Sequence, residues 1–158
     1  MVETGVESVR ADYERLAQRV RNELAAAGLP VVAPGLAVEV AVGAEVIVDM
    51  ADLLFFDEGD PEVVVTWRVG PQLRSNVIAD AMHQRGVTEA IRHCGEVEAA
   101  MADAMIAILS AAGFTARNHG NDLSPFDVQV LAGPQPDRRP GWALPDVSPV
   151  PAVGSEAG

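Results

Sequence analysis

Apolar residues recur every three or four positions between residues 7 and 27, which is the spacing of one face of an α-helix. The positions on this face are Val9, Tyr13, Leu16, Ala17, Val20, Leu24 and Ala27. Ser8 is a suitable N-cap, Gly28 can take the left-handed conformation that ends a helix, and Pro30 prevents the helix from resuming. We therefore predict an amphipathic helix over residues 7–27.

The apolar period changes to two between residues 36 and 50, which indicates β-strands. The residues on the apolar faces are Val38, Val40 and Val42 in a first strand and Val46, Val48 and Met50 in a second. Gly43-Ala44 between them fits the two-residue type II′ turn of a hairpin. Residues 62–69 form a third run, with Val63, Val65, Trp67 and Val69 on one face. The pattern predicts a three-stranded meander.

Helical spacing returns after Gly70-Pro71, with proline near the first turn and a helix that ends at Gly86. Thr88 can cap a further helical segment, which we expect to break or bend at Gly95. A long apolar stripe then follows, formed by Val97, Met101, Ala104, Met105, Ile108, Leu109 and Ala112. Residues 114–117 and 126–131 are predicted to be short strands joined by a polar loop.

These elements predict one α+β domain over residues 1–132. Its sheet is mainly antiparallel, a three-strand meander plus one or two C-terminal strands, and helices cover one face. Residues 133–158 are rich in proline and glycine and show no periodicity, so they are predicted to form a disordered, flexible tail. Trp142 is a candidate anchor of this tail on a partner.

The composition is that of a folded protein, since 49% of the residues are apolar and 22% are charged. The chain has a single cysteine, no signal-like start and no apolar run of about 20 residues, so we expect a cytoplasmic protein that does not enter a membrane. Its eleven basic residues are all arginine, which is typical of a bacterium with a GC-rich genome.

The net charge of -12 argues against binding to nucleic acid or to an anionic membrane surface. Eight acids and only Arg68 lie between residues 37 and 69. The candidate partner-binding residues are Asp57, Glu58, Asp60 and Glu62, which we call the acidic sheet end, together with Trp142. Carboxylates gathered at a sheet rim favour a protein with a basic surface, although they also solubilise a turn. They lack the ligand spacing of a calcium-binding EF-hand loop.

Cys94 is a candidate for a catalytic thiol, with His93 or His119 as its base. A nucleophilic cysteine must be a thiolate, and a helix beginning near Glu96 would favour that form. However, His93 and Cys94 are adjacent in sequence, which places their side chains about 100° apart on a helix. A lone cysteine in an alanine-rich helix is more often a small buried residue.

Asp80 and His83 are weak metal candidates because they lie three positions apart on one predicted helix face. A solvated polar pair is the alternative. The spacings of the histidines and the cysteine match no zinc motif, and no phosphate loop or serine-nucleophile motif is present. We therefore expect no cofactor and no metal.

The pattern favours a non-catalytic, acidic protein-binding module. The order of elements and the acidity resemble small dimeric secretion chaperones and the acidic immunity proteins of toxin pairs, a likeness of architecture that does not fix function. A homodimer could form if Met101 and Met105 were on the surface, although the same stripe fits a core. The alternatives are a small Cys94-dependent enzyme and a small-molecule-binding domain with an aliphatic pocket between sheet and helix.

Overall fold

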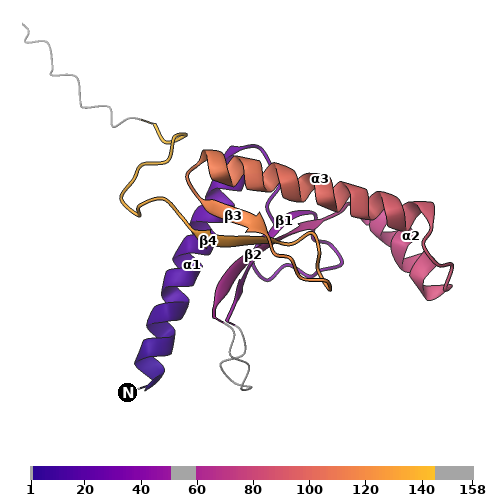
Figure 1. Cartoon of the computed structure of the whole chain (residues 1–158), viewed down its shortest axis with the longest axis horizontal. Helices are drawn as coiled ribbons and strands as arrows, with labels where there is room; N and C mark the ends of the chain where they lie inside the picture. Colours follow the sequence, from indigo (N-terminus) through magenta and orange to yellow (C-terminus); the bar gives the residue numbers. More distant parts are fainter. Residues whose placement is uncertain (1, 51–59, 145–158) are drawn as a thin grey trace, which may run out of the picture.

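The computed structural model describes residues 2–50 and 60–144 (Figure 1). The elements in that part are α1 (Val2–Ala26), β1 (Gly43–Asp49), β2 (Glu62–Arg68), α2 (Pro71–Met82), α3 (Glu89–Ala111), β3 (Thr115–Asn118) and β4 (Val128–Ala132). The predicted α+β class is therefore confirmed.

The four strands form one antiparallel sheet in the order β1-β2-β4-β3. Val46 of β1 is paired with Val65 of β2, which in turn is paired with Val128 of β4. Successive side chains on each strand point to opposite faces, so these three valines share a face. Helices α1 and α3 cover that face (Figure 1), and we call the opposite side of the sheet the open face.

The core lies between the sheet and these two helices and is almost entirely aliphatic. Its buried residues are Ala17, Val20 and Leu24 of α1, Ala102, Met105 and Leu109 of α3, Ala44, Val46, Val63, Val65, Val128 and Val130 of the sheet, and Phe114. The apolar stripe of α3 is therefore core, because Met105 is fully buried. Met101 of the same stripe is half-buried, so Met105 is not available to the methionine surface on which the homodimer expectation depends.

Helix α1 ends as the sequence predicts but begins earlier. Gly28 takes a φ of 91°, and the amide of Leu29 donates to the carbonyl of Leu24. The expected N-cap, Ser8, instead lies inside the helix, which begins at Val2. The N-terminal half of α1 extends past the sheet (Figure 1), so Val6 and Val9 remain exposed although they continue the apolar stripe.

The predicted strand around Val38, Val40 and Val42 is wrong. Residues 36–42 form no strand and include a turn at residues 38–40, and β1 begins at Gly43, the position predicted for the turn of a hairpin. The edge of β1 is paired instead with the chain after α1, since Val32 donates to the carbonyl of Ala44 at 2.9 Å. Because this earlier segment occupies the edge at Ala44, the sheet has no place there for residues 38–42.

Helices α2 and α3 are joined by a short connection whose last residue, Thr88, is the N-cap of α3. The Thr88 hydroxyl accepts a hydrogen bond from the amide of Ile91 at 3.3 Å, which confirms the predicted cap. Helix α3 then runs without interruption through Gly95, so the expected bend at that residue is wrong. Within the two described ranges, no helix is both long and apolar enough to cross a bilayer.

The chain continues past β4 along the C-terminal ends of α1 and α3. We call residues 133–142 the C-terminal strap. Gly133 lies so close to Leu16 and Phe114 that an added β-carbon would be 3.1 Å from each side chain. The first residues of the predicted tail therefore pack against the domain, and residues 145–158 lie outside the described residues.

Candidate functional site

Cys94 lies in the second turn of α3 and is partly buried. Its sulfur donates to the Glu98 carboxylate, with 3.7 Å between Sγ and Oε1. Burial raises the pKa of the Cys94 thiol, and the negative charge of Glu98 raises it further. The thiol is therefore held in its protonated form, which is the opposite of what a nucleophile needs.

The two candidate bases have other partners. His93 is exposed, and its Nδ1 atom lies 4.0 Å from a carboxylate oxygen of Glu96. His119 begins the loop after β3, and its Nε2 atom lies 2.7 Å from Oε1 of Glu62 on β2. The structure therefore provides neither histidine as a hydrogen-bonded base for Cys94.

Asp80 and His83 each have hydrogen-bond partners within the protein. Asp80 accepts hydrogen bonds from Arg85 at 2.9 Å and from the Thr88 hydroxyl at 2.5 Å. The Thr88 hydrogen bond is the main cause that lowers the pKa of Asp80, and Arg85 lowers it further. His83 Nδ1 lies 2.7 Å from the carbonyl oxygen of Ala79. No group of three His, Cys, Asp or Glu residues able to hold a metal ion exists among residues 2–50 and 60–144.

The acidic sheet end is only partly described. Asp57 and Glu58 lie outside the described residues, and Asp60 is exposed. Glu62 is on the open face, where its carboxylate accepts a hydrogen bond from Gln129 and contacts His119. Glu62 is therefore part of the acidic sheet end and also links β2 to β4 and to the loop after β3.

Sequence reasoning missed Glu98, which lies at the edge of a hollow of about 240 Å³ with Trp67 and Phe126. Burial is the main cause that raises the pKa of Glu98, and the charge of Asp127 raises it further. A carboxyl with a raised pKa is a candidate general acid. Its contact in the structure is the Cys94 thiol, however, whose hydrogen bond partly offsets this rise in the pKa of Glu98 while the same contact raises the pKa of Cys94.

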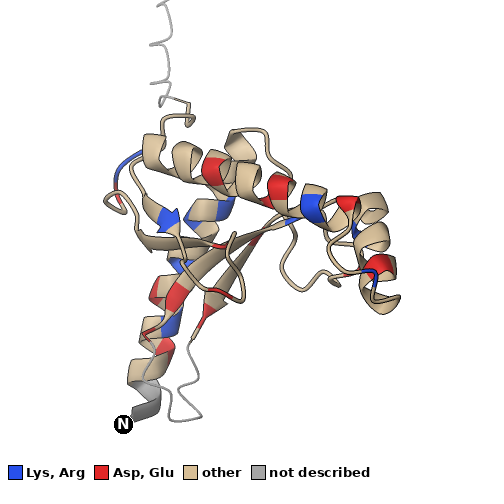
Figure 2. Ribbon diagram, turned by 45° about the vertical axis from the view of Figure 1, so that its right-hand side comes forward, with Lys and Arg blue, Asp and Glu red and all other residues tan. Residues whose placement is uncertain are grey.

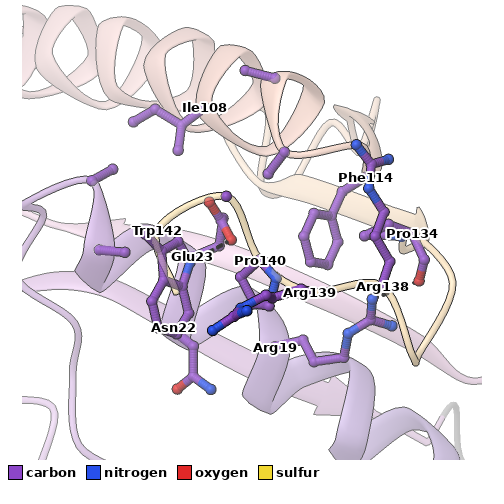
Figure 3. A pocket seen from close by; sticks show the side chains of 15 residues that line it. Arg19, Asn22, Glu23, Ile108, Phe114, Pro134, Arg138, Arg139, Pro140 and Trp142 are labelled. Atoms are coloured by element: carbon purple, nitrogen blue, oxygen red, sulfur yellow. Dashed lines mark hydrogen bonds between the residues drawn. The ribbon is translucent and has the colours of Figure 1, made fainter. Parts of the chain in front are cut away.

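A cleft lies between the C-terminal ends of α1 and α3 and is bounded by the C-terminal strap (Figure 3). Its volume is about 590 Å³. Its apolar lining consists of Ala26, Ala27, Ile108, Ala111, Ala112 and Phe114 together with Pro134, Pro140 and Trp142 of the strap. Its charged residues are Arg19, Glu23, Arg138 and Arg139. The sequence predicts an aliphatic pocket between sheet and helix, whereas this cleft lies between two helices and the strap.

The strap is attached to α1 at both ends. Arg19 donates to the carbonyl oxygen of Pro134 at 2.5 Å, and its guanidinium lies 5.6 Å from the centre of the Phe114 ring. The indole of Trp142 donates to the Glu23 carboxylate at 2.9 Å. Figure 3 shows Trp142 on one side of the cleft and Arg19 and Arg138 on the other, near Phe114.

The signal that could have located this cleft is the sequence Arg138-Arg139 shortly before Trp142, which is the chain's one pair of adjacent basic residues. In a chain with a net charge of -12, adjacent arginines in a segment without periodicity are unusual enough to suggest a site. What the sequence could not show is that Arg19 and Glu23, more than 100 positions earlier, complete it.

Comparison with known proteins places the chain in no group: no family model, curated protein or solved structure matches it.

Proposed function

We propose that the protein is a non-catalytic binding domain that docks a protein with a basic surface through its acidic sheet end and the adjoining open face. The observation that carries this proposal is that none of the described helices covers the open face (Figure 1), and that apolar side chains are exposed there beside carboxylates. Ile47 is 40% exposed and Leu131 is 47% exposed. Glu62 lies on the same face, and Asp60 lies at its end. Apolar residues surrounded by charges are typical of protein interfaces.

Most of the arginines have partners within the fold, which leaves several surface carboxylates without a basic neighbour. Arg15, Arg68, Arg85 and Arg92 pair with carboxylates, and Arg19, Arg21 and Arg74 donate to main-chain carbonyl oxygens. Several exposed carboxylates have no ion pair among the described residues, namely Glu7, Glu14, Glu39, Asp60, Asp103 and Asp122. Figure 2 shows acidic positions on all three helices and on the β1–β2 hairpin. Such a surface steers positively charged partners toward it.

A second copy of the chain is a weaker candidate for the same face. A two-fold symmetric interface would bring identical acidic patches together, and like charges repel. Binding to a basic partner weakens as salt is added, whereas self-association of an acidic chain strengthens. Sedimentation at two salt concentrations therefore distinguishes the two assemblies.

The test is capture of partners from the native cell lysate by the tagged protein and by a variant with Asp57, Glu58 and Asp60 changed to arginine. The matched control changes Glu39, Asp103 and Asp122 to arginine, which alters the net charge equally at positions away from the acidic sheet end. We expect a stoichiometric basic partner with the wild type and the control and its loss with the first variant. Equal capture by all three proteins would refute the proposed surface.

A further inference from the structure

The cleft beside the C-terminal strap has the opposite sign of charge to the rest of the molecule. Its lining includes three arginines and one glutamate, which gives it a formal charge of about +2 in a chain of net charge -12. Carboxylates outnumber arginines by about two to one over the whole sequence. A local excess of arginine against that background needs a physical reason.

Neutralisation of the helix ends accounts for only part of this excess. The C-terminal ends of α1 and α3 both border the cleft, and each carries about half a negative charge from its aligned peptide dipoles. Neither helix has a basic residue in its own last turn, so arginines of the strap compensate these dipoles. Arg19 and Glu23 have opposite charges and Arg139 has a further interaction of its own, so Arg138 provides the one positive charge that remains. The cleft therefore suits a single negative charge better than a doubly charged phosphate.

The geometry leaves the Arg138 guanidinium able to bind the negatively charged group of a ligand. Arg19 is held by the carbonyl of Pro134 and by Phe114, whereas the Arg138 guanidinium makes no hydrogen bond to residues 2–50 or 60–144. A guanidinium can bind both oxygens of a carboxylate at once, which gives direction as well as charge.

The rest of the lining suits an apolar body that contains a ring. The volume of about 590 Å³ falls within the range of small-molecule sites, about 300–1,000 Å³. Trp142 and Phe114 provide aromatic surfaces, and Ile108 and the alanines of both helices provide aliphatic ones. We propose that this cleft binds a small organic carboxylate with an apolar, ring-bearing body, the carboxylate on Arg138 and the ring against Trp142.

Titration calorimetry on the full chain with three probes of one shape tests the proposal. The probes are 4-phenylbutanoate, its neutral amide and the cationic amine 4-phenylbutylamine. We expect the carboxylate to bind with a stoichiometry of one. The amide should bind more weakly by about tenfold or by a larger factor, and the amine should not bind. Equal affinity for carboxylate and amide, or no binding of the carboxylate up to about millimolar concentration, would overturn the proposal.

The variant Arg138→Gln locates the carboxylate, and Arg117→Gln is its matched control. Both arginines are exposed, but Arg117 lies on β3, where it donates to Gln129 and not to the cleft. We expect Arg138→Gln to weaken 4-phenylbutanoate about tenfold and Arg117→Gln to change it less than about twofold. An equal loss in both variants would show general charge attraction and overturn the assignment to Arg138. The three-probe comparison on the wild type stands even if one variant fails to fold.

This inference does not depend on the protein-docking proposal, because the cleft and the acidic sheet end share no residue. Carboxylate binding without partner capture, or capture without carboxylate binding, would each refute one proposal and leave the other standing.

Discussion

Gly43 is the residue where the chain after α1 comes closest to the sheet. It has a φ of 107°, and an added β-carbon would lie 2.2 Å from the carbonyl oxygen of Pro30. We expect Gly43→Ala to lower the free energy of unfolding by about 2 kcal/mol or more, since both the backbone conformation and the contact oppose a side chain. Urea unfolding measures this change.

Gly95→Ala is the matched control for that substitution. An added β-carbon there would meet the Phe126 ring at 3.6 Å, which is ordinary contact, inside a regular helix. The free energy of unfolding should rise by about 0.5–1 kcal/mol because alanine favours the helix. A Gly43→Ala protein as stable as Gly95→Ala would contradict the close approach of Pro30.

Glu98→Gln should change two measurable quantities at once. Because burial raises the pKa of Glu98, its charged form opposes folding at neutral pH, and the neutral amide removes that cost. The stability gained by the variant should be absent at about pH 3.5, where the carboxyl is protonated in both the folded and unfolded states, and should grow toward about pH 7.5. Urea midpoints at the two pH values measure it.

The same variant should lower the pKa of Cys94, because the negative charge of Glu98 is one of the causes that raise it. Iodoacetamide should therefore label Cys94 faster in Glu98→Gln than in the wild type, and fastest in the unfolded chain. Rapid labelling of the native wild type near neutral pH would instead support the hypothesis of a catalytic thiol.

At the scale of the elements, Arg74 of α2 shapes residues 36–42. Its guanidinium donates to the carbonyls of Val38, Glu39, Ala41 and Val69. We expect Arg74→Met to lower the free energy of unfolding by about 2 kcal/mol, since several carbonyls lose a charged donor. Cleavage by a glutamate-specific protease after Glu39 should also become faster.

The control for Arg74 is Arg15→Met, which removes a surface pair with Asp12 on α1. That pair is largely exposed, so its loss should cost less than about 0.5 kcal/mol and leave cleavage after Glu39 unchanged. Similar effects of the two variants would show that residues 36–42 are ordered without Arg74.

The elements that the sequence predicted well are those whose signals are local. Thr88 and Gly28 mark helix ends through their own hydrogen bond or backbone conformation. Val63 and Val65 belong to the core, as the strand period predicts. Val38 and Val40 show the same period but form turns. Residues 36–42 are kept out of the sheet by the hydrogen bond of Val32 to Ala44 and by the hydrogen bonds of Arg74. Neither contact can be predicted from residues 36–42 themselves.

At the scale of the whole molecule, self-repulsion should limit stability. The net charge is -12, and most arginines are used inside the fold or in local pairs, so many carboxylates face one another through solvent. Sodium chloride screens that repulsion. We expect the midpoint of thermal unfolding to rise between about 10 mM and about 300 mM salt. A fall over this range would indicate that the surface ion pairs contribute more than the repulsion costs.

The cleft is the part of the candidate site that lay furthest beyond sequence reasoning. The chemistry of Arg138 and Trp142 is visible in the sequence, but the cleft exists only because these residues meet Arg19 and Glu23 across most of the chain. Nothing local predicts such a pairing. The acidic sheet end, by contrast, consists of residues close together in the sequence, so it can be identified from the sequence alone.

The attachment of the strap to α1 has a consequence for biosynthesis. Arg19 and Glu23 leave the ribosome early, whereas Pro134 and Trp142 follow 115 and 119 positions later. Contacts between such distant residues form late in folding, because the intervening chain must be ordered first. A nascent chain that has already folded its first helix therefore still lacks this cleft, and any metabolite that fits the cleft can be retained only by a polypeptide whose translation has passed Trp142.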